Sequence, residues 1–386
     1  MNLQSSISST LLPGACRRMA LAVVVAVAAS AFGIGCSSTS QAAPPVPIVN
    51  RGELQTEMNT LVDLGVPGVV VMVSDGGESV TLTAGVSDLE AGTAMGAGAT
   101  FRIASMTKPY TATVVLQLVD EGILHLDDTV DKWLPDIVAN SDEITIRELL
   151  NHTSGVGEYS DAPAVLQPYL EGDFEHVWTP QQLVEIGNQV GATSDPGAEW
   201  SYSNTNYAIV GLLVEAATGH SLGDEMQTRI FDTLELEHTT FADSTKLDPN
   251  MAHGYLLGGD APLDVTGVYP FPWGAGNIVS DAADATTFYS ALISGDLLSA
   301  ATLAEMLPAA DAEPLYGLGL MAWTLPCGIA YGHDGGYAGY STRSLVLEGG
   351  RQVVILANSI TLDDDLSSDP AAGPQFDLIV QDTICG

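Results

Sequence analysis

The sequence is poor in positive charge. Its 386 residues include 11 lysines and arginines against 48 aspartates and glutamates, which gives a formal net charge of -37 at pH 7. Nucleic acids and anionic membrane surfaces attract proteins through clusters of lysine and arginine. A nucleic-acid-binding protein, or one held on a membrane by a basic patch, is therefore excluded. The hydrophobic content of 46% nevertheless indicates a folded chain with a real core.

Motifs for metals and nucleotides are also missing. None of the seven histidines forms an H-E-x-x-H motif or an i, i+4 pair, and no C-x-x-C occurs. The chain has neither a P-loop nor a G-x-G-x-x-G fingerprint. The sequence therefore predicts no metal and no cofactor.

The N-terminus has the pattern of an export signal. Arg17 and Arg18 precede an apolar run that is shorter than the roughly 20 residues needed to span a bilayer. The predicted signal, residues 1–36, ends in Gly-Ile-Gly-Cys, which resembles a bacterial lipobox with Cys36 as the lipidated residue. The alternative is a plain secretory signal. Residues 37–50 are a Ser/Ala/Pro-rich tether. We expect an exported protein, either a cell-membrane lipoprotein anchored only through that lipid, or a secreted or periplasmic one.

The remainder, residues 51–386, is predicted to be one α+β domain. Alternating and β-branched patterns predict two early strands joined by a glycine turn, and more strands after Leu315. Amphipathic helices stand at both ends. The expected elements are helices at 52–64 and 375–383 and strands at 69–74, 79–86, 316–324, 329–333, 341–347 and 351–358. Two strands at the start and three or four at the end most simply form one antiparallel sheet, predicted as five-stranded, flanked by helices and built from about 51–121 and 270–386.

The segment of about 122–269 is predicted to be a mostly α-helical insertion. Thr179 begins a capping box with proline at the first helical position, Ser221 and Asp281 are predicted helix N-caps, and Gly295 is a predicted helix stop. A cleft between the sheet part and this helical part is the expected place for a site.

Two cysteines remain outside the leader. Cys327 and Cys385 form an even pair in a chain that is predicted to meet oxidising conditions. The prediction is a disulfide that ties the strand before His333 to the last helix. The alternative is a pair of buried thiols.

The sequence FRIASMTKPY contains a candidate nucleophile. Ser105 and Lys108 stand three residues apart at the predicted start of a helix that runs to about Glu121, so their side chains share a face. A lysine can activate a neighbouring serine if its pKa falls well below about 10.4. The alternative is a serine that caps the helix and an ordinary solvated lysine.

Two further clusters could complete such a site. Tyr202 and Asn204, in YSN, lie in a loop that enters a helix, where the tyrosine could move a proton. His333, Gly335 and Gly336, in HDGG, lie at a predicted strand end where glycines allow close approach of a substrate. Taken singly, these clusters could also be a packing aromatic and a glycine-rich turn with an exposed histidine.

Together the three motifs resemble those of the serine penicillin-recognising enzymes, within them the class C β-lactamase and D-alanyl-D-alanine carboxypeptidase branch. That branch carries S-x-x-K, then Y-x-N, then H-x-G or K-T-G. The stretches LLNHTSG (149–155) and FPWGAGNIVSDAADATTFYSALISGDLLS (271–299) are also similar. The resemblance covers nearly everything from about residue 50 onward and implies a β-lactamase/transpeptidase-like fold.

The resemblance also implies roles for residues. Ser105 would be the acylated nucleophile, Lys108 its activating partner, and Tyr202 the proton carrier, with the general base left open between the last two. His333 would take the place of the K-T-G lysine, and the N–H groups of Ser105 and Gly336 would form the oxyanion hole. Substrate contacts are expected from Asn204, Gly335, Gly336, Trp273 and Arg343.

The implied function is that of a monomeric exported serine hydrolase acting on small peptide, β-lactam or ester substrates, with peptidoglycan as a further partner. The expected activity is that of a D-alanyl-D-alanine carboxypeptidase; the alternatives are an esterase and a weak class C-type β-lactamase. A catalytically inactive peptide-binding protein is the alternative from another class. Recognition of a free carboxylate needs a cation or hydroxyl. Asp334 stands where K-T-G has a hydroxyl, which leaves Arg343 as the candidate ligand.

Overall fold

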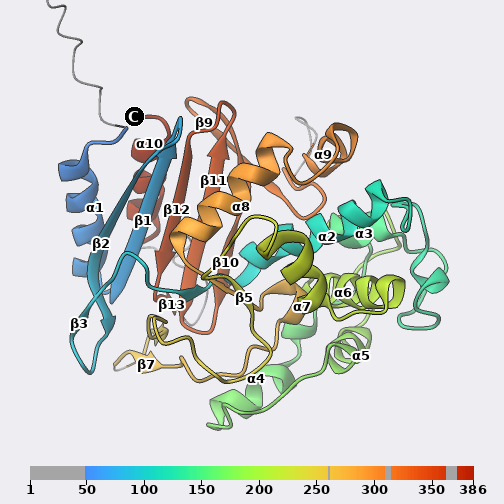
Figure 1. Ribbon diagram of the computed structural model, residues 1–386. Coiled ribbons are helices and arrows are strands. Elements are labelled where there is room, and N and C mark those ends of the chain that lie inside the picture. The colour runs from blue at the N-terminus through green and yellow to red at the C-terminus, as the bar shows by residue number, and fades with distance from the viewer. Residues whose placement is uncertain (1–47, 260, 309–313, 362–371) are drawn as a thin grey trace, which may run out of the picture. The chain divides into compact units, whose positions relative to one another are not determined.

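A seven-stranded antiparallel sheet lies at the centre of the fold (Figure 1), in a computed structural model that describes residues 48–259, 261–308, 314–361 and 372–386. The strand order is β3-β2-β1-β12-β11-β10-β9. The strands are β1 Gly68–Asp75, β2 Glu78–Asp88, β3 Thr93–Ala94, β9 Met321–Leu325, β10 Gly328–Tyr337, β11 Tyr340–Leu347 and β12 Gln352–Ala357. The predicted antiparallel sheet is confirmed, because β1 pairs with β2 on one side and with β12 on the other. It has seven strands instead of five: β9 at one edge corresponds to the strand expected at 316–324, and the short β3 at the other edge was not predicted.

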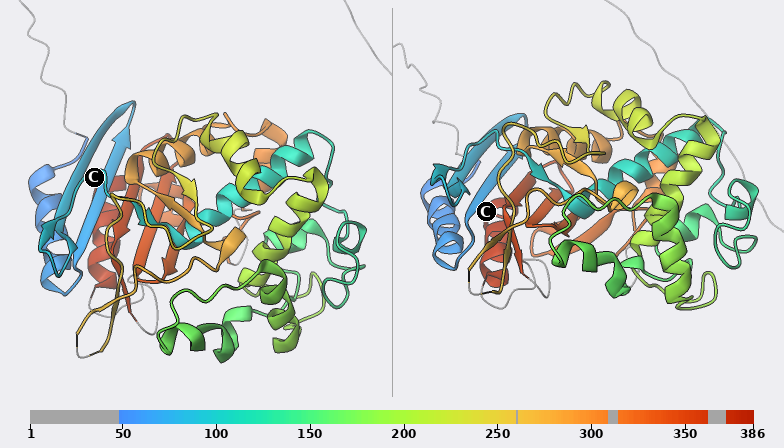
Figure 2. Two further views of the ribbon diagram at one scale, coloured as in Figure 1. Left: turned by 60° about the horizontal axis from the view of Figure 1, so that its bottom comes forward. Right: turned by 90° about the horizontal axis from the view of Figure 1, so that it is seen from below.

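Helices cover both faces of the sheet. Val69, Val71 and Val73 of β1 pack against the two terminal helices, α1 (Arg51–Asp63) and α10 (Gly373–Ile384). Val70 points to the opposite face, into the core that includes α2 (Lys108–Asp120) and α8 (Ala282–Ser294). Figures 1 and 2 show the terminal helices and α8 on opposite sides of the sheet. This period-two alternation is expected for a strand buried on both faces.

The predicted helical segment carries five α-helices: α3 Ile146–Leu150, α4 Pro163–Leu170, α5 Pro180–Val190, α6 Asn204–Thr218 and α7 Leu222–Met226. The capping box at Thr179 and the N-caps Ser221 and Asp281 are confirmed, and Gly295 ends α8 with a φ of 83°. The segment also contains three strands that were not predicted, β5 Thr240–Phe241, β6 Tyr255–Leu257 and β7 Leu263–Asp264. Strands of two or three residues are too short to give a period-two pattern.

Short elements complete the fold: α9 Ala300–Met306, β4 Phe101–Arg102, β8 Ile278–Ser280 and β13 Ser359–Thr361. Within the described ranges, no helix has the length and apolarity needed to span a membrane. The predicted signal 1–36, with Cys36, and the tether up to residue 47 lie outside the described residues and stay predictions. Asn50, the last tether residue, caps α1 by accepting from the N–H groups of Gly52 and Glu53.

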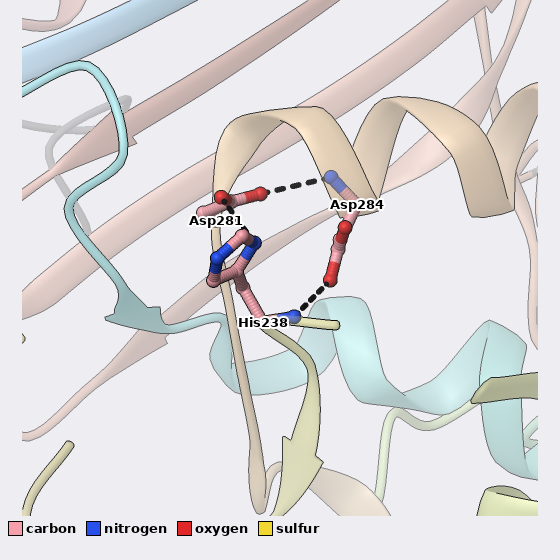
Figure 3. A group of neighbouring side chains, drawn as sticks. All are labelled: His238, Asp281 and Asp284. Atoms are coloured by element: carbon pink, nitrogen blue, oxygen red, sulfur yellow. Dashed lines mark hydrogen bonds and ion pairs between the residues drawn. The ribbon is translucent and has the colours of Figure 1, made fainter. Parts of the chain in front are cut away.

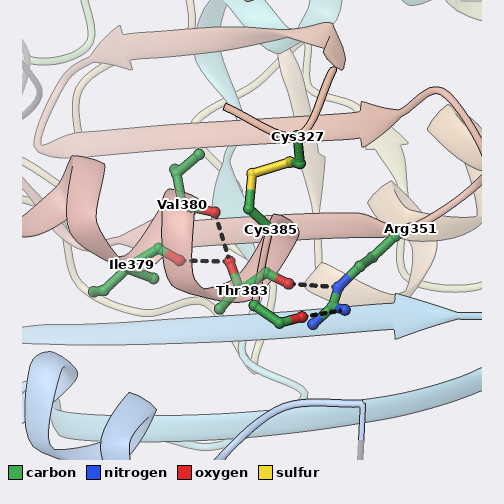
Figure 4. The surroundings of a disulfide bond; sticks show 7 residues. Cys327, Arg351, Ile379, Val380, Thr383 and Cys385 are labelled. Carbon is green, nitrogen blue, oxygen red and sulfur yellow. Dashed lines mark hydrogen bonds between the residues drawn. A yellow bond between two sulfur atoms is a disulfide. The ribbon is translucent and has the colours of Figure 1, made fainter. Parts of the chain in front are cut away.

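A disulfide links Cys327 to Cys385, with the two Cα atoms 5.4 Å apart (Figure 4). Cys327 lies in the turn between β9 and β10, and Cys385 caps α10. Next to it, Arg351 donates to the carbonyl oxygens of Thr383 and Gly386 at 2.7 Å each. The C-terminal helix is therefore tied to the edge of the sheet that carries the HDGG motif, as predicted.

Glu57 gives the pairing of the two terminal helices a pH dependence. Burial, with a hydrogen bond to Asp382 of α10 and the charges of Asp382 and Glu53, raises the pKa of Glu57 to about 7. A carboxyl whose pKa is raised in the folded state contributes stability below its unfolded pKa of 4.5, and that contribution is lost as pH rises through about 7. We expect Glu57→Gln to raise the Tm by about 2 °C at pH 8 and to change it little at pH 5.

Scanning calorimetry at the two pH values measures this effect. The matched control is Asp63→Asn, which removes an exposed charge from the same helix that is not among those acting on Glu57. The same Tm shift at pH 5 and pH 8 in Glu57→Gln would contradict the account, because the gain would then not come from titration of this carboxyl.

Candidate active site

The Ser105 turn borders a cavity between the sheet and the helical segment. The cavity has a volume of about 170 Å³. Its polar residues are Ser105, Ser160 and Asn204, and its larger apolar residues are Tyr159, Leu166, Phe271, Pro272 and Tyr337. These residues come from five separate segments of the chain, so the predicted cleft between the two parts exists.

Ser105 lies in a 3₁₀ turn, Ala104–Thr107, directly before α2. The predicted helix is therefore correct in extent, but its first turn is tighter than an α-helix. Ala104, the residue before the serine, has a φ of 50°, which alanine rarely adopts. Such strain is common at active sites, and here it accompanies a half-buried serine at the cavity.

Lys108 is fully buried and lies beside the serine. Its Nζ is 2.9 Å from Oγ of Ser105, 2.7 Å from Oδ1 of Asn204 and 3.2 Å from the carbonyl oxygen of Ala275. Burial lowers the pKa of Lys108 to about 7, although the charges of Glu158 and Asp334 act in the opposite direction. A large share of the amine is therefore neutral near pH 7.

The three contacts assign the lone pair of that neutral amine. Two of the partners, Oδ1 of Asn204 and the Ala275 carbonyl, can only accept hydrogen bonds, so they take the two N–H groups. The lone pair then faces the Ser105 hydroxyl. This is the arrangement a general base needs.

Glu158 orients Asn204 and was missed in the sequence. Its carboxylate accepts from the backbone N–H of Asn204, from the Asn204 side-chain amide at 3.0 Å and from the Ser160 hydroxyl at 2.6 Å. The amide nitrogen of Asn204 is thereby turned to Glu158 and its oxygen to Lys108. The sequence contains 48 aspartates and glutamates, and no motif distinguishes Glu158 from the others.

Tyr202 shares a hydrogen bond with Ser105, and its ring lies under Nζ of Lys108 at 4.8 Å from the ring centroid. Burial raises the pKa of Tyr202 well above 10. The tyrosine therefore stays protonated. Of the two candidate bases, the electrostatics favour Lys108.

β10 approaches the serine through its glycines. A Cβ at Gly335 would lie 2.5 Å from the Ile103 carbonyl oxygen and 2.9 Å from the Ser105 nitrogen, so only glycine fits. Gly336 lines the same cavity as Ser105. Both residues thus border the cavity, and the oxyanion hole formed by the N–H groups of Ser105 and Gly336 stays a prediction.

His333 was predicted to replace the lysine of the K-T-G motif, but it is not among the residues that line the cavity. Its side chain is 1% exposed and contacts the Tyr316 hydroxyl at 3.1 Å. Burial and the charge of Lys108 lower the pKa of His333 to about 3. The residue is therefore neutral, and a role as a cation finds no support.

Arg343 lies on the wrong face for a substrate contact. It forms an ion pair with Asp377 of α10 at 3.1 Å and a longer one with Asp334 at 3.7 Å, and it packs on the rings of Trp323 and Phe376. Alternation along β11 directs Arg343 to the α10 side, whereas Thr342 reaches the Ile103 carbonyl beside the nucleophile turn. The expected carboxylate ligand is therefore absent from this position, and Asp334 faces Arg343 instead of the cavity.

Trp273 also differs from its predicted place. A Cβ added to Gly211 of α6 would lie 2.5 Å from Cζ3 of the indole, so the ring is packed against that helix. The same loop reaches the cavity with Pro272, Ala275 and Gly276. Phe271 of this loop also lines the cavity, whereas Trp273 is not among the lining residues.

Two groups of acidic and histidine side chains in the described parts of the chain lie close enough to share an ion. In one, the imidazole of His238 lies 3.3 Å from the Asp281 carboxylate, while the Asp284 carboxylate accepts from the backbone N–H of His238 at 2.7 Å (Figure 3). Asp281 is already engaged as the N-cap of α8. The second group is Glu53, Glu57 and Asp382. Neither includes a residue of the Ser105 cavity.

A second serine motif occurs in the chain. Gly219–Gly223 reads G-x-S-x-G, the nucleophile pattern of α/β-hydrolases. In the structure, Ser221 caps α7, with its hydroxyl 2.8 Å from the Asp224 carboxylate. No strand runs into this turn, so it is not a nucleophile elbow.

Fold and site together define a serine hydrolase with an S-x-x-K nucleophile turn. The sequence profile of the family described as Beta-lactamase matches residues 54–373. The chain belongs to the β-lactamase family.

Related curated proteins are named penicillin-binding proteins. The chain is 28% identical over 317 residues to penicillin-binding protein 4* of Bacillus subtilis, covering 76% of this chain and 68% of that protein. It is 33% identical over 232 residues to penicillin-binding protein 4 of Amycolatopsis lactamdurans, covering 58% of each.

Solved structures give the same fold. A D-stereospecific amidohydrolase from Streptomyces sp. is 36% identical with a TM-score of 0.74, covering 80% of this chain and 94% of that one. A D-amino acid amidase from Ochrobactrum anthropi SV3 is 26% identical with a TM-score of 0.76, covering 86% and 96%. An octameric penicillin-binding protein homologue from Pyrococcus abyssi shares the fold at 24% identity and a TM-score of 0.72, covering 85% and 77%. The predicted monomer stays a prediction.

Proposed function

We propose that this serine hydrolase forms an acyl-enzyme on Ser105 and acts on amides or esters of small apolar acyl compounds that carry no free carboxylate at the scissile end. Amides and esters of D-amino acids are the first class to test. One observation carries the choice: among the described residues that line the cavity, none is a lysine or an arginine.

The lack of a lysine or arginine among the described residues that line the cavity weakens the case for the two alternative activities. A D-alanyl-D-alanine carboxypeptidase and a β-lactamase each have to bind a carboxylate, which needs a positive charge or several donors. Arg343 is already paired with Asp377 and Asp334 on the other face of the sheet. The carboxylate of Glu158 lies next to Asn204 and would repel a second carboxylate.

The cavity walls favour an apolar acyl group. Tyr159, Phe271 and Tyr337 line it, and Leu166 stands at its rim with 45% of its surface exposed. Burial of apolar surface contributes about 25 cal/mol per Å², so such walls select for hydrophobic substrates. The Streptomyces and Ochrobactrum neighbours, named as an amidohydrolase and an amidase, support the same class.

The reaction follows from the contacts of Ser105. The lone pair of Lys108 takes the hydroxyl proton while Oγ attacks the substrate carbonyl. The oxyanion forms near the N–H groups of Ser105 and Gly336. Tyr202, which shares a hydrogen bond with Ser105, gives its hydroxyl proton to the leaving group and takes the proton held by Lys108 in its place, so both side chains return to their starting state. Water hydrolyses the acyl-enzyme by the reverse sequence.

A substrate panel tests the proposal. Rates should be compared for D-phenylalanine amide, a p-nitrophenyl ester, a D-Ala-D-Ala peptide and nitrocefin. We expect kcat/KM for the uncharged amide or ester to exceed that for the peptide and for nitrocefin by about 100-fold. A D-Ala-D-Ala peptide or nitrocefin as the best substrate would overturn the proposed substrate class but not the chemistry at Ser105.

A designed cation provides the matched control. Leu166→Arg places a positive charge at the rim, whereas Leu166→Gln removes the same apolar contact without a charge. We expect the arginine variant to exceed the glutamine variant on the D-Ala-D-Ala peptide by about 5-fold. Equal rates would indicate that the carboxylate is bound elsewhere.

A further inference from the structure

A line of buried hydrogen bonds runs behind the catalytic side chains, from the end of α3 to β10. Its members are His152, Tyr316 and His333, which are 0%, 7% and 1% exposed. The Tyr316 hydroxyl lies 3.1 Å from Nε2 of His152 and 3.1 Å from Nε2 of His333. A tyrosine hydroxyl has one proton, so it donates to one imidazole and accepts from the other.

The contacts of His152 show which group donates in its hydrogen bond to Tyr316. Nδ1 of His152 accepts the backbone N–H of Ser203 at 3.2 Å. The Asn206 amide nitrogen lies 3.2 Å from the same Nδ1, while the amide oxygen of Asn206 accepts from Ser154 at 2.6 Å. A ring nitrogen that accepts hydrogen bonds carries no proton. Neutral His152 therefore has its proton on Nε2 and donates it to Tyr316.

The donor in the hydrogen bond between Tyr316 and His333 can be assigned in the same way. Tyr316 accepts from His152 and turns its own proton to Nε2 of His333. The Tyr207 hydroxyl also contacts Tyr316, but it gives its proton to the Leu150 carbonyl at 2.9 Å. A proton given by Tyr316 to Tyr207 instead would leave two lone pairs facing each other, because the Asp334 carbonyl oxygen can only accept and so holds the His333 proton on Nδ1, leaving Nε2 bare.

His333 then has its remaining proton on Nδ1. That nitrogen lies 2.5 Å from the Asp334 carbonyl oxygen and 3.8 Å from the Asp334 carboxylate, so the carbonyl is the acceptor. Neutral rings agree with the burial of both residues, because burial and the charge of Lys108 lower the pKa of His152 and of His333.

We infer that His152, Tyr316 and His333 form a neutral brace of fixed tautomers, in which His333 is a positioning residue that donates its Nδ1–H to the Asp334 carbonyl. His333 is then neither a cation for the substrate nor an acid–base group. This explains why a histidine can stand where related motifs carry lysine.

The brace connects two parts of the site. At one end, the ring of His152 lies on the ring of Tyr202, with centroids 4.4 Å apart and a tilt of 35°. At the other end, β9 pairs with β10 only as far as Gly332, so the following edge of β10 faces the Ser105 turn. Residues two apart in a strand direct their backbone groups to the same edge, so Asp334 and Gly336 share it. The N–H of His333 thus holds the Asp334 carbonyl on the same edge from which Gly336 borders the cavity.

Tautomers can be read directly in the full-length protein labelled with 15N-histidine. Long-range proton–nitrogen spectra between pH 6 and 8 should show His333 protonated at Nδ1 only and His152 at Nε2 only, with no change over this range. His333→Asn and His152→Asn assign the signals. An imidazolium signal, or the opposite tautomer, from either ring would overturn the inference. This readout does not depend on the proposed function or on any variant being active.

Three His333 variants test the positioning role by their rate of Ser105 labelling with a fluorophosphonate. Asparagine offers an N–H near the place of Nδ1, glutamine offers one near Nε2, and lysine offers a cation. We expect His333→Asn to stay within about 5-fold of the wild type and His333→Gln and His333→Lys to lose about 50-fold, because they lose the N–H that His333 Nδ1 donates to the Asp334 carbonyl. High activity in His333→Lys with an inactive, folded His333→Asn would show that a cation is needed.

Discussion

Replacement of Ser105 by alanine should lower kcat for a p-nitrophenyl ester by about 10,000-fold or more, because the nucleophile is lost while the cavity and its donors remain. The hydroxyl is the only group removed, and its partners are Lys108 and Tyr202. The melting temperature should change little, since Ser105 is only half-buried. Steady-state kinetics on purified protein measure the loss.

Ser160→Ala is the matched control. Ser160 lines the same cavity, but its hydroxyl donates to Glu158 at 2.6 Å and does not contact Lys108. We expect its kcat to stay within about 3-fold of the wild type. Turnover above 1% in Ser105→Ala, beside a normal Ser160→Ala, would mean that another group attacks the substrate.

Replacement of Lys108 by methionine should slow acylation by about 1,000-fold, because the amine that acts as base is lost and the buried Tyr202 hydroxyl keeps its proton. In the wild type, burial lowers the pKa of Lys108 to about 7, and only the deprotonated amine can accept a proton. The acylation rate should therefore rise as pH passes through about 7 and stay level above it. Stopped-flow measurement with an ester between pH 5.5 and 9 gives this profile.

Lys108→Arg tests whether Lys108 acts as a base or only through its positive charge. Arginine keeps the positive charge and cannot act as a base, since its pKa exceeds 12. We expect it to be as slow as Lys108→Met. An active arginine variant, or a rate that rises only above pH 9, would move the role of base to Tyr202.

The strand pattern allowed most of the sheet to be predicted, and the exceptions have physical reasons. Residues 69–74 and 79–86 were predicted as strands because β-branched residues are dense there, and β1 and β2 extend them by at most two residues at either end. β10 was predicted to end at His333 because glycines usually interrupt strands. It continues to Tyr337, since Gly335 is needed for the close approach to Ser105.

The site was predictable where its residues lie in one motif. Ser105 and Lys108 are neighbours through local geometry, and Tyr202 and Asn204 follow from the resemblance. Glu158 and Tyr316 act only through partners distant in the sequence, so no local pattern marks them. For Arg343, alternation indicates that it and Thr342 point to opposite faces, but the sequence does not tell which face borders the cavity.

Peptide mass spectrometry after brief exposure to a fluorophosphonate tests the central claim most directly. The account predicts one covalent adduct, on the peptide that contains Ser105, with Ser160 and Ser221 unmodified and with no adduct in Ser105→Ala. Labelling should be faster at pH 8 than at pH 6, because the Lys108 amine is then deprotonated. An unmodified Ser105 in protein that still hydrolyses esters, or an adduct on Ser221 instead, would contradict it.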